Sequence, residues 1–449
     1  MEKTTQLSVM GGGLVGCLLS LYLAKQGYRV DVYERRPDLR RTDIGGGRSI
    51  NLALSDRGWR ALETIGIAED IRKVAIPMYQ RVMHDKNGNL SFQPYGQEGQ
   101  AIYSVSRGGL NQALLDLAEA EPTISLHFQQ QVMEVEVATN KVTMLDTVSG
   151  QEHHISPDVI FAADGAYSMV RLSLQKTDRF NYEQSYLDYG YKELTIPPAA
   201  DGGWQLEKNA LHIWPRGQYM MIALPNVDGS FTCTMFFPYE GDPSFKSLQT
   251  PEQLTSFFQE VFPDATALMP DLAQEFFENP IGSLVTIKCL PWRHSGKILL
   301  LGDAAHAIVP FYGQGMNAGF EDCTVLRGLL EQHQDDWETI FQTFQDVRKP
   351  NTDAIADLAV YNFIEMRDKV ADPRFLLQKK IEAKITAQYP DSWLPLYSMV
   401  TFSPDLPYAE ALANGQRQEE IMRVLMEHIQ KEEDYNKPEV QEYLQAQLA

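Results

Sequence analysis

Three glycines near the start of the chain have the spacing of a turn that binds a dinucleotide. Gly11, Gly13 and Gly16 follow a short apolar run and open a helical pattern. The next apolar run ends at an acid, Glu34. Glycines let the backbone approach a pyrophosphate at a helix N-terminus, and an acid in this place can accept hydrogen bonds from ribose hydroxyls. The spacing therefore predicts nucleotide binding, and the alternative is an ordinary glycine-rich turn between a strand and a helix.

Two acidic turns later in the chain could hold other parts of such a nucleotide. Asp164 begins the sequence Asp-Gly-Ala-Tyr-Ser-Met-Val-Arg, and Asp303 lies in Gly-Asp-Ala-Ala-His, each shortly after an apolar run. An aspartate at a strand end, such as Asp303, can hold a ribityl hydroxyl. The sequence Gly-Gln-Gly-Met-Asn at 313–317 precedes a helical pattern, and its backbone N–H groups could meet the electron-rich pyrimidine edge of a flavin. The alternative is a set of unrelated turns.

The hydrophobic pattern indicates which elements position these motifs. Residues 7–10 and 29–33 are strand-like runs on either side of a helical run, which together make one βαβ unit. Runs at 159–162 and 298–301 supply strands that end near the two acidic turns. Between them, residues 180–290 contain short apolar runs separated by Pro-Asn and Asp-Gly turn signals, which are typical of an antiparallel sheet. After about residue 323 the pattern is helical, with long stretches near 350–370, 373–388 and 417–447.

Composition restricts the class of protein further. The 449 residues are 44% hydrophobic and carry a formal net charge of −21, which disfavours nucleic acids and anionic lipid surfaces unless a local basic patch exists. The tightest basic cluster, at 35–41, is short and includes Asp38. Four scattered cysteines lack metal-ligand spacing, and no stretch reaches the roughly 20 apolar residues of a membrane span. Since glycines interrupt the N-terminal apolar run, we expect no signal peptide, and a soluble cytoplasmic protein without metal or nucleic acid.

The three motifs, in this order and at these separations, resemble those of the FAD-dependent aromatic hydroxylases. Other stretches are similar to the branch of that family that hydroxylates kynurenine, and this resemblance extends to about residue 405. These stretches are Gly-Gly-Gly-Arg-Ser-Ile-Asn-Leu-Ala-Leu-Ser at 45–55, and residues 80–84, 93–96, 104–107, 309–317 and 320–323.

The resemblance implies a bound FAD that is reduced by NADPH and reacts with O2 to a flavin C4a-hydroperoxide. The distal oxygen would pass to the ring carbon beside the aniline nitrogen of L-kynurenine, which would leave as 3-hydroxykynurenine. Because the cofactor carries this chemistry and the aniline activates the ring, we expect neither a nucleophilic side chain nor a dedicated general base. His306, inside the third motif, is therefore interpreted as a structural hydrogen-bonding residue. The family has no second Rossmann domain for the nicotinamide, and this sequence has no second Gly-x-Gly-x-x-Gly motif.

The motifs and the resemblance together assign residues to a site. Arg107 is expected to be the counter-charge of the cofactor, with a surface arginine as the alternative, and Asp164 to serve both FAD and NADPH. The cofactor-binding residues predicted are Gly11, Gly13, Val15, Gly16, Glu34, Arg35, Ala53, Arg107, Asp164, Asp303, Gly315, Met316 and Asn317. The substrate-binding residues implied by the resemblance are Arg81, Tyr95, Asn362 and Tyr397 at the amino-acid end, with Phe236 and Phe311 beside the aromatic ring.

The expected architecture is α/β, with a Rossmann-like FAD-binding domain interrupted by an antiparallel-sheet substrate domain and followed by a C-terminal helical region. The FAD-binding domain is predicted from residues 1–75, 100–176 and 286–330, the substrate domain from 76–99 and 177–285, and the helical region from 331–449.

Arg81 points to the substrate independently of the resemblance. Strand alternation places it on the same face as Tyr79 and Met83, an apolar face where a guanidinium needs a partner. A substrate carboxylate held by two hydrogen bonds would be such a partner. From the sequence alone, an internal salt bridge or an exposed arginine is the alternative.

Asn362 is a polar residue on an apolar helical stripe. The helix is expected to begin near Pro350, and a polar side chain on its buried face must be hydrogen-bonded, either to substrate or to a neighbouring helix. The apolar residues of the same stripe are Ile355, Leu358, Ala359 and Met366.

The end of the chain and the type of reaction leave alternatives open. Residues 406–449 are rich in Glu, Gln and Lys with intermittent Leu and Ile, which indicates an amphipathic surface helix rather than the membrane-associating segment of eukaryotic relatives. This helix could cover the substrate domain or join a partner subunit in a homodimer. The functional alternatives are hydroxylation of another aromatic acid, a non-oxygenating flavin reductase on the same fold, and a flavin-binding regulator.

Overall fold

The computed structural model describes residues 4–41, 50–96, 99–368 and 372–448. In these residues a six-stranded sheet, in the order β18-β19-β12-β1-β2-β8, is parallel except where β18 pairs with β19. Its strands are β1 (Gln6–Met10), β2 (Arg29–Glu34), β8 (Ile124–Phe128), β12 (Val159–Ala162), β18 (Arg293–His294) and β19 (Ile298–Leu300). The predicted βαβ unit and the two later strands are confirmed within one residue at each end.

The register of this sheet brings the three motifs to one edge. Met10 of β1 lies opposite Ala162 of β12, which lies opposite Leu300 of β19. Parallel strands bind ligands beyond their carboxyl ends, so the turns that follow these strands face a common space. Motifs that are far apart in the sequence therefore meet.

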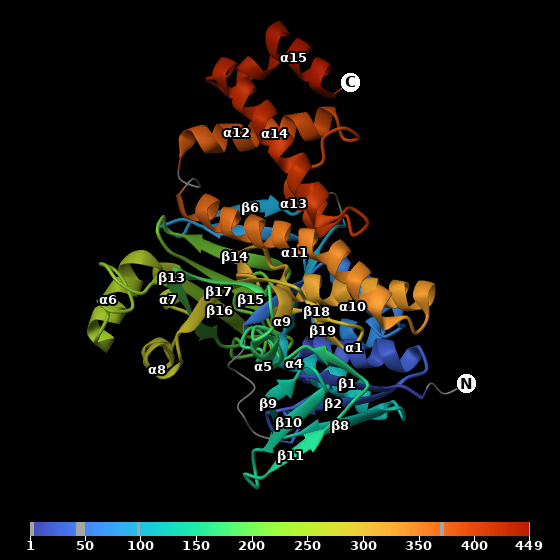
Figure 1. The fold of residues 1–449 in the computed structure, drawn as a ribbon. Coiled ribbons are helices and arrows are strands. Elements are labelled where there is room, and N and C mark those ends of the chain that lie inside the picture. The colour runs from blue at the N-terminus through green and yellow to red at the C-terminus, as the bar shows by residue number, and fades with distance from the viewer. Residues whose placement is uncertain (1–3, 42–49, 97–98, 369–371, 449) are drawn as a thin grey trace.

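A seven-stranded sheet forms the second large layer; in Figure 1 its strands β13 to β16 are green and β6 is blue. Its order is β17-β13-β16-β15-β14-β5-β6, and every neighbouring pair is antiparallel except β14 with β5. The strands are β5 (Gln80–His84), β6 (Leu90–Pro94), β13 (Asn181–Ile196), β14 (Ala210–Pro215), β15 (Met220–Pro225), β16 (Phe231–Pro238) and β17 (Gly282–Leu290). The expected antiparallel character is thus confirmed, with one parallel pair where β5 joins from an earlier part of the chain.

Two small antiparallel sheets and the helices complete the fold. The small sheets are β3 (Asn51–Leu54), β4 (Ala75–Met78) and β7 (Ile102–Ser106), and β9 (Gln130–Glu136), β10 (Lys141–Asp146) and β11 (Glu152–Ile155). Helices before the long α11 are α1 (Leu14–Lys25), α2 (Asp56–Thr64), α3 (Ala68–Arg72), α4 (Arg107–Ala120), α5 (Met169–Leu174), α6 (Pro251–Val261), α7 (Pro263–Thr266), α8 (Leu272–Glu278), α9 (Asp303–His306) and α10 (Gly315–His333). The later helices are α11 (Trp337–Asp368), α12 (Pro373–Gln388), α13 (Leu396–Thr401), α14 (Tyr408–His428) and α15 (Pro438–Leu448).

The expectation that a helix begins near Pro350 is wrong. Helix α11 begins at Trp337 and continues through Pro350. Proline removes one hydrogen bond and strains the preceding turn. Buried residues on both sides of it, Phe344 before and Ile355 after, anchor the helix in two different hydrophobic clusters.

The C-terminal residues form a unit of their own rather than one surface helix. The predicted stretch 417–447 is divided into α14 and α15 by a 3-10 turn at Glu432–Asn436. The first part of α14 packs on α11 and α13, while its later residues share a separate core with α12 and α15. In Figure 1 these red and orange helices stack beyond α11 at one end of the molecule.

Close packing at Gly16 gives a first testable prediction. A Cβ atom at Gly16 would lie 1.9 Å from the carbonyl oxygen of Gly11, so Gly16→Ala must push the β1–α1 turn apart. We expect a lower thermal midpoint and loss of bound FAD, measured by thermal unfolding and flavin absorbance.

Gly328→Ala is the matched control, because a Cβ there meets nothing within 4 Å and the residue lies inside α10. This change should raise stability by up to about 1 kcal/mol. A Gly16→Ala protein that behaves like Gly328→Ala would contradict the packing of the turn.

Candidate active site

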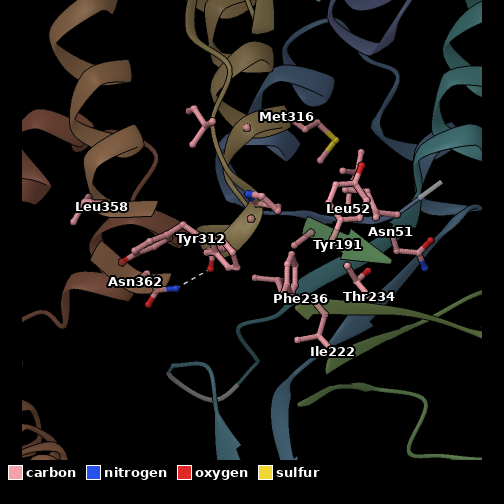
Figure 2. A pocket seen from close by; sticks show the side chains of 18 of the residues that line it. Asn51, Leu52, Tyr191, Ile222, Thr234, Phe236, Tyr312, Met316, Leu358 and Asn362 are labelled. Carbon is pink, nitrogen blue, oxygen red and sulfur yellow. Dashed lines mark hydrogen bonds between the residues drawn. The ribbon is translucent and has the colours of Figure 1, made fainter. Parts of the chain in front are cut away.

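A cavity of about 1650 Å³ lies where the two large sheets, α11 and the C-terminal helices meet. All of the predicted site residues line it except Gly16 and Asn317. Figure 2 shows Phe236, Ile222 and Thr234 entering it from the seven-stranded sheet, opposite Tyr312 and Asn362. The fold therefore gathers residues from nearly the whole length of the chain into one space.

The nucleotide end of the cavity has an open helix terminus. Gly11 has a φ of +104°, and a Cβ there would lie 2.4 Å from the carbonyl oxygen of Ala163. Gly13 is the N-cap of α1 and supplies no side chain to the free N–H groups of the helix. A Cβ at Gly13 would meet nothing within 4 Å. These features leave room for an anionic group at the positive end of the helix.

Glu34 stands beside this turn. Its Oε2 accepts a hydrogen bond from the backbone N–H of Gly12 at 2.9 Å, and its Oε1 accepts from the backbone and the guanidinium of Arg36. Burial raises the pKa of Glu34, but the bonds from Arg36 and Gly12 outweigh burial and hold the pKa below its ordinary value. The carboxylate therefore stays charged and fixes the turn.

Two aspartates also line the cavity. Oδ2 of Asp164 accepts from the backbone N–H groups of Met169 and Val170 at 2.8 and 3.2 Å. Its Oδ1 is buried without a hydrogen-bond partner among the described residues, and burial raises its pKa. An orphaned acceptor of this kind fits a hydroxyl donor from a bound nucleotide. Asp303 is the first residue of α9 and also faces the cavity.

Asn317 supports the site from behind the cavity wall. Its Oδ1 accepts from the backbone N–H of Ser55 at 3.0 Å, and its Nδ2 donates to the carbonyls of Ala53 and Gly313 at 2.9 and 2.8 Å. The side chain thus fixes β3 to the turn that precedes α10. The helix itself begins at Gly315 without a side-chain cap, so its N–H groups are open to the cavity.

Arg81 lies at the other end of the cavity. Its guanidinium carbon is 4.6 Å from the ring centre of Tyr95 and 4.3 Å from that of Tyr397, and these two rings stack at 5.6 Å. Met83 also lines the cavity, whereas Val82 and His84 are buried on the opposite face of β5, so the predicted shared face of Arg81 and Met83 is confirmed. Tyr79 precedes β5, is half-exposed and does not line the cavity. The hydroxyl of Tyr95 is buried without a hydrogen-bond partner in the described part of the chain. Burial raises the pKa of Tyr95, so this hydroxyl stays protonated and can donate.

Asn362 and two phenylalanines form the wall next to Arg81. Asn362 Nδ2 donates to the carbonyl of Phe311 at 2.7 Å, the dashed line in Figure 2. Phe311 lies 4.8 Å from Phe236 and 4.3 Å from Phe363, measured between ring centres. Of the predicted stripe on α11, Ile355, Leu358 and Ala359 are buried, while the side chain of Met366 lies outside the described residues.

Comparisons with known proteins decide the family. The model of the FAD binding domain family matches residues 4–359. The chain is 51% identical over 443 residues to the kynurenine 3-monooxygenase of Flavobacterium johnsoniae, covering 98% of both chains. It is 50% identical over 426 residues to that of Flavobacterium psychrophilum, covering 95% of this chain and 94% of that one.

The chain belongs to the kynurenine 3-monooxygenase family.

The fold agrees with this placement. The solved structure of 2-methyl-3-hydroxypyridine-5-carboxylic acid oxygenase superposes with a TM-score of 0.68 over 83% of this chain and 95% of that chain, at 22% identity. The predicted resemblance to FAD-dependent aromatic hydroxylases is confirmed, although residues 45–49, on which it partly rested, lie outside the described residues. Among the described helices, none is both long and apolar enough to cross a membrane.

Several residues in the cavity of this kynurenine 3-monooxygenase family member were not predicted. Tyr312 stacks on Tyr397 with ring centres 5.7 Å apart. From the sheet, alternate residues of β15 and β16 face the cavity beside the predicted Phe236, and these additional residues are Met220, Ile222, Leu224 and Thr234. Period-two alternation along those strands could have identified them. His306, by contrast, is buried against Asp322 with Nε2–Oδ2 at 2.6 Å and does not line the cavity.

Glu34→Gln tests the nucleotide end. Loss of the charge weakens bonds to Gly12 and Arg36 and removes an acceptor for ribose hydroxyls, so FAD affinity should fall by about 10- to 100-fold, as for loss of a charged hydrogen bond. Titration of the apoprotein with FAD, followed by flavin fluorescence, measures this. Glu63→Gln, a change at an exposed residue of α2, is the control and should bind FAD normally.

The lowered pKa of Glu34 predicts a pH dependence of the difference in stability between the unchanged protein and Glu34→Gln. A carboxyl whose folded pKa is lowered stabilises the protein above its unfolded pKa, about 4.3 for glutamate, and this contribution is lost as pH falls through the lower folded value. The thermal midpoint of the unchanged protein should exceed that of Glu34→Gln above about pH 5, and the gap should close in more acidic buffers. A gap that widens on acidification would refute the assignment.

Proposed function

We propose that this chain hydroxylates L-kynurenine to 3-hydroxykynurenine, with FAD bound and with NADPH and O2 as co-substrates. The observation that carries the substrate is Arg81, which lies in the cavity between Tyr95 and Tyr397 while no carboxylate of the described residues forms a salt bridge with it. A buried guanidinium that has only aromatic rings beside it favours the binding of an anion. The α-carboxylate of an aromatic amino acid supplies one.

Lys379, a neighbouring cation, differs from Arg81 because it already has carboxylate partners. Lys379 lines the same end of the cavity, and its Nζ lies 3.0 Å from Glu382 and 3.7 Å from Glu365. Its charge is already compensated by the protein. Arg81 is therefore the cation that binds the substrate carboxylate in this proposal, and the buried hydroxyl of Tyr95 adds a second hydrogen-bond donor beside it.

The middle of the cavity suits an aromatic ring. Phe236, Phe311 and Ile222 line the cavity, and Figure 2 shows Phe236 and Ile222 across it from Asn362. Apolar walls exclude water, which strengthens polar interactions and prevents loss of reactive species. No histidine or cysteine lines the cavity among the described residues, in keeping with an aniline ring that needs no dedicated base.

The residues at the other end fit FAD. The uncapped N-termini of α1 and α10 suit its pyrophosphate and its electron-rich ring edge, and the orphaned Oδ1 of Asp164 suits a hydroxyl donor. When bound, FAD accepts a hydride from NADPH and activates O2 for insertion into the ring. The protein positions both partners and keeps water out.

Product analysis tests the proposed function. Purified protein loaded with FAD should consume NADPH and O2 on addition of L-kynurenine and should form 3-hydroxykynurenine whose new oxygen derives from labelled O2. NADPH oxidation without oxygen insertion would identify a flavin reductase instead. Turnover of a different aromatic acid, with none of L-kynurenine, would change the substrate but keep the reaction class.

Arg81→Ala tests the substrate end. We expect a higher KM for L-kynurenine, equivalent to a loss of about 2–4 kcal/mol, because a charge-assisted bidentate contact is removed. Tyr95→Phe should cost less, about 1 kcal/mol, since it removes one hydroxyl. FAD content should not change in either variant. Arg423→Ala, at an exposed arginine of α14, is the control for loss of a positive charge. An unchanged KM in Arg81→Ala would refute the role of Arg81.

Other predictions from the sequence stay predictions. The division into an FAD-binding domain and a substrate domain is supported by β5 and β6, which share a sheet with β13–β17, although β17 continues to Leu290. A cytoplasmic location is supported by four cysteines that are all free and buried. The homodimer can be checked by light scattering.

A further inference from the structure

Arg57, near the start of α2, binds a distant part of the chain through its whole guanidinium. The side chain is fully buried. Nε donates to the carbonyl of Val400 at 2.9 Å, and the two terminal nitrogens donate to the carbonyls of Ser403, Pro404 and Leu406. The guanidinium also lies 4.0 Å from the ring centre of Tyr408. We call residues 400–408 the 400–408 segment.

The 400–408 segment begins three residues after Tyr397, whose ring flanks the guanidinium of Arg81. Tyr397 lies on α13, one turn before Val400, whose carbonyl is among the last of that helix and lacks a helical partner. Arg57 satisfies this carbonyl. The position of α13, and with it the ring of Tyr397 beside Arg81, therefore depends on a contact made by α2.

Arg57 is also part of a buried ion network. Its Nη1 lies 2.7 Å from Glu321 on α10, and Arg348 on α11 binds both Glu321 and Asp322. Burial raises the pKa of Glu321, but Arg348 and Arg57 outweigh it and hold the pKa below its ordinary value. The carboxylate is therefore charged, and removing one guanidinium leaves it incompletely compensated.

We propose that Arg57 is a positioning residue for the substrate: it holds the 400–408 segment against α2 so that Tyr397 lies beside Arg81. This inference rests on the proposed function. Arg57 does not line the cavity, and its contacts are to the 400–408 segment, Tyr408 and Glu321. It acts on L-kynurenine only through Tyr397 and its neighbours.

A lysine cannot replace the guanidinium. Arginine presents five donors in a rigid planar fork, whereas lysine carries three donors on one nitrogen. Lysine at this position would retain the charge beside Glu321 but would lose most of the bonds to the four carbonyls. Arg57→Lys therefore releases the 400–408 segment while it disturbs the ion network least.

A double-mutant cycle tests the proposal with binding as the readout. The dissociation constant of L-kynurenine is measured from the change in flavin absorbance of the FAD-loaded protein, without NADPH, for Arg57→Lys, Tyr397→Ala and the double variant. We expect Arg57→Lys to weaken binding on the order of tenfold, within the range for coupled neighbours, with unchanged FAD content. In the Tyr397→Ala background the same change should have little further effect. Arg423→Lys is the matched control.

Arg60→Ala is the second variant, in case Arg57→Lys does not yield folded protein. Arg60 binds Pro404 and Asp405 of the same segment from a half-buried position. The Arg60→Ala change should weaken L-kynurenine binding by a smaller factor than Arg57→Lys does, and again only when Tyr397 is present.

Three outcomes would overturn the proposal. In the first, the factors by which Arg57→Lys and Tyr397→Ala each weaken L-kynurenine binding multiply in the double variant, which means that the two residues act independently. In the second, FAD is lost in parallel with L-kynurenine binding, which indicates a general structural role. In the third, the unchanged protein neither binds nor hydroxylates L-kynurenine, so the proposed function itself falls. The first two leave the hydroxylase activity of the unchanged protein intact and are thereby distinguished from the third.

Discussion

Two adjacent carboxylates in the middle of α10, Glu321 and Asp322, hold the cofactor end and the substrate end in one frame. Glu321 pairs with Arg57 and Arg348, and Asp322 accepts from Arg348, His306 and the backbone N–H of Gly302. Buried carboxylates are unfavourable unless they are paired, so α2, α10 and α11 must come together in an arrangement that satisfies both. That arrangement places the third nucleotide motif and Asn362 in the same cavity.

Strand β5 shows how the strand that carries a cavity-lining side chain is held from its opposite face. Arg81 faces the cavity, while His84 on the opposite face lies with Nδ1 2.6 Å from Asp264 and Nε2 2.9 Å from His212. Burial lowers the pKa of His212 to about 4, so its ring is neutral near neutral pH: Nε2 donates to the carbonyl of Glu207 and Nδ1 accepts from His84. Because alternate residues of a strand point to opposite faces, this network holds the strand without occupying the cavity.

The cavity has polar groups at both ends and apolar side chains between them. Open helix termini and aspartates stand at the nucleotide end, and a guanidinium between tyrosine rings stands at the other. Phe236 and Phe311, whose ring centres lie 4.8 Å apart, add an aromatic wall to the same cavity. Pockets of this composition take their specificity from a few polar groups and much of their affinity from apolar contact.

The sequence by itself determined the cofactor motifs, the strands that carry them and the face of β5 on which Arg81 lies. These are local properties, because a glycine turn or an alternating strand is specified by residues next to one another. Only the tertiary structure decided that α11 passes through Pro350 and that Arg57 binds the 400–408 segment. The contacts of Arg57 join residues 264 to 349 positions apart, and no local pattern in the chain contains such information. Burial of unlike charges from separate segments is settled only when the segments pack together.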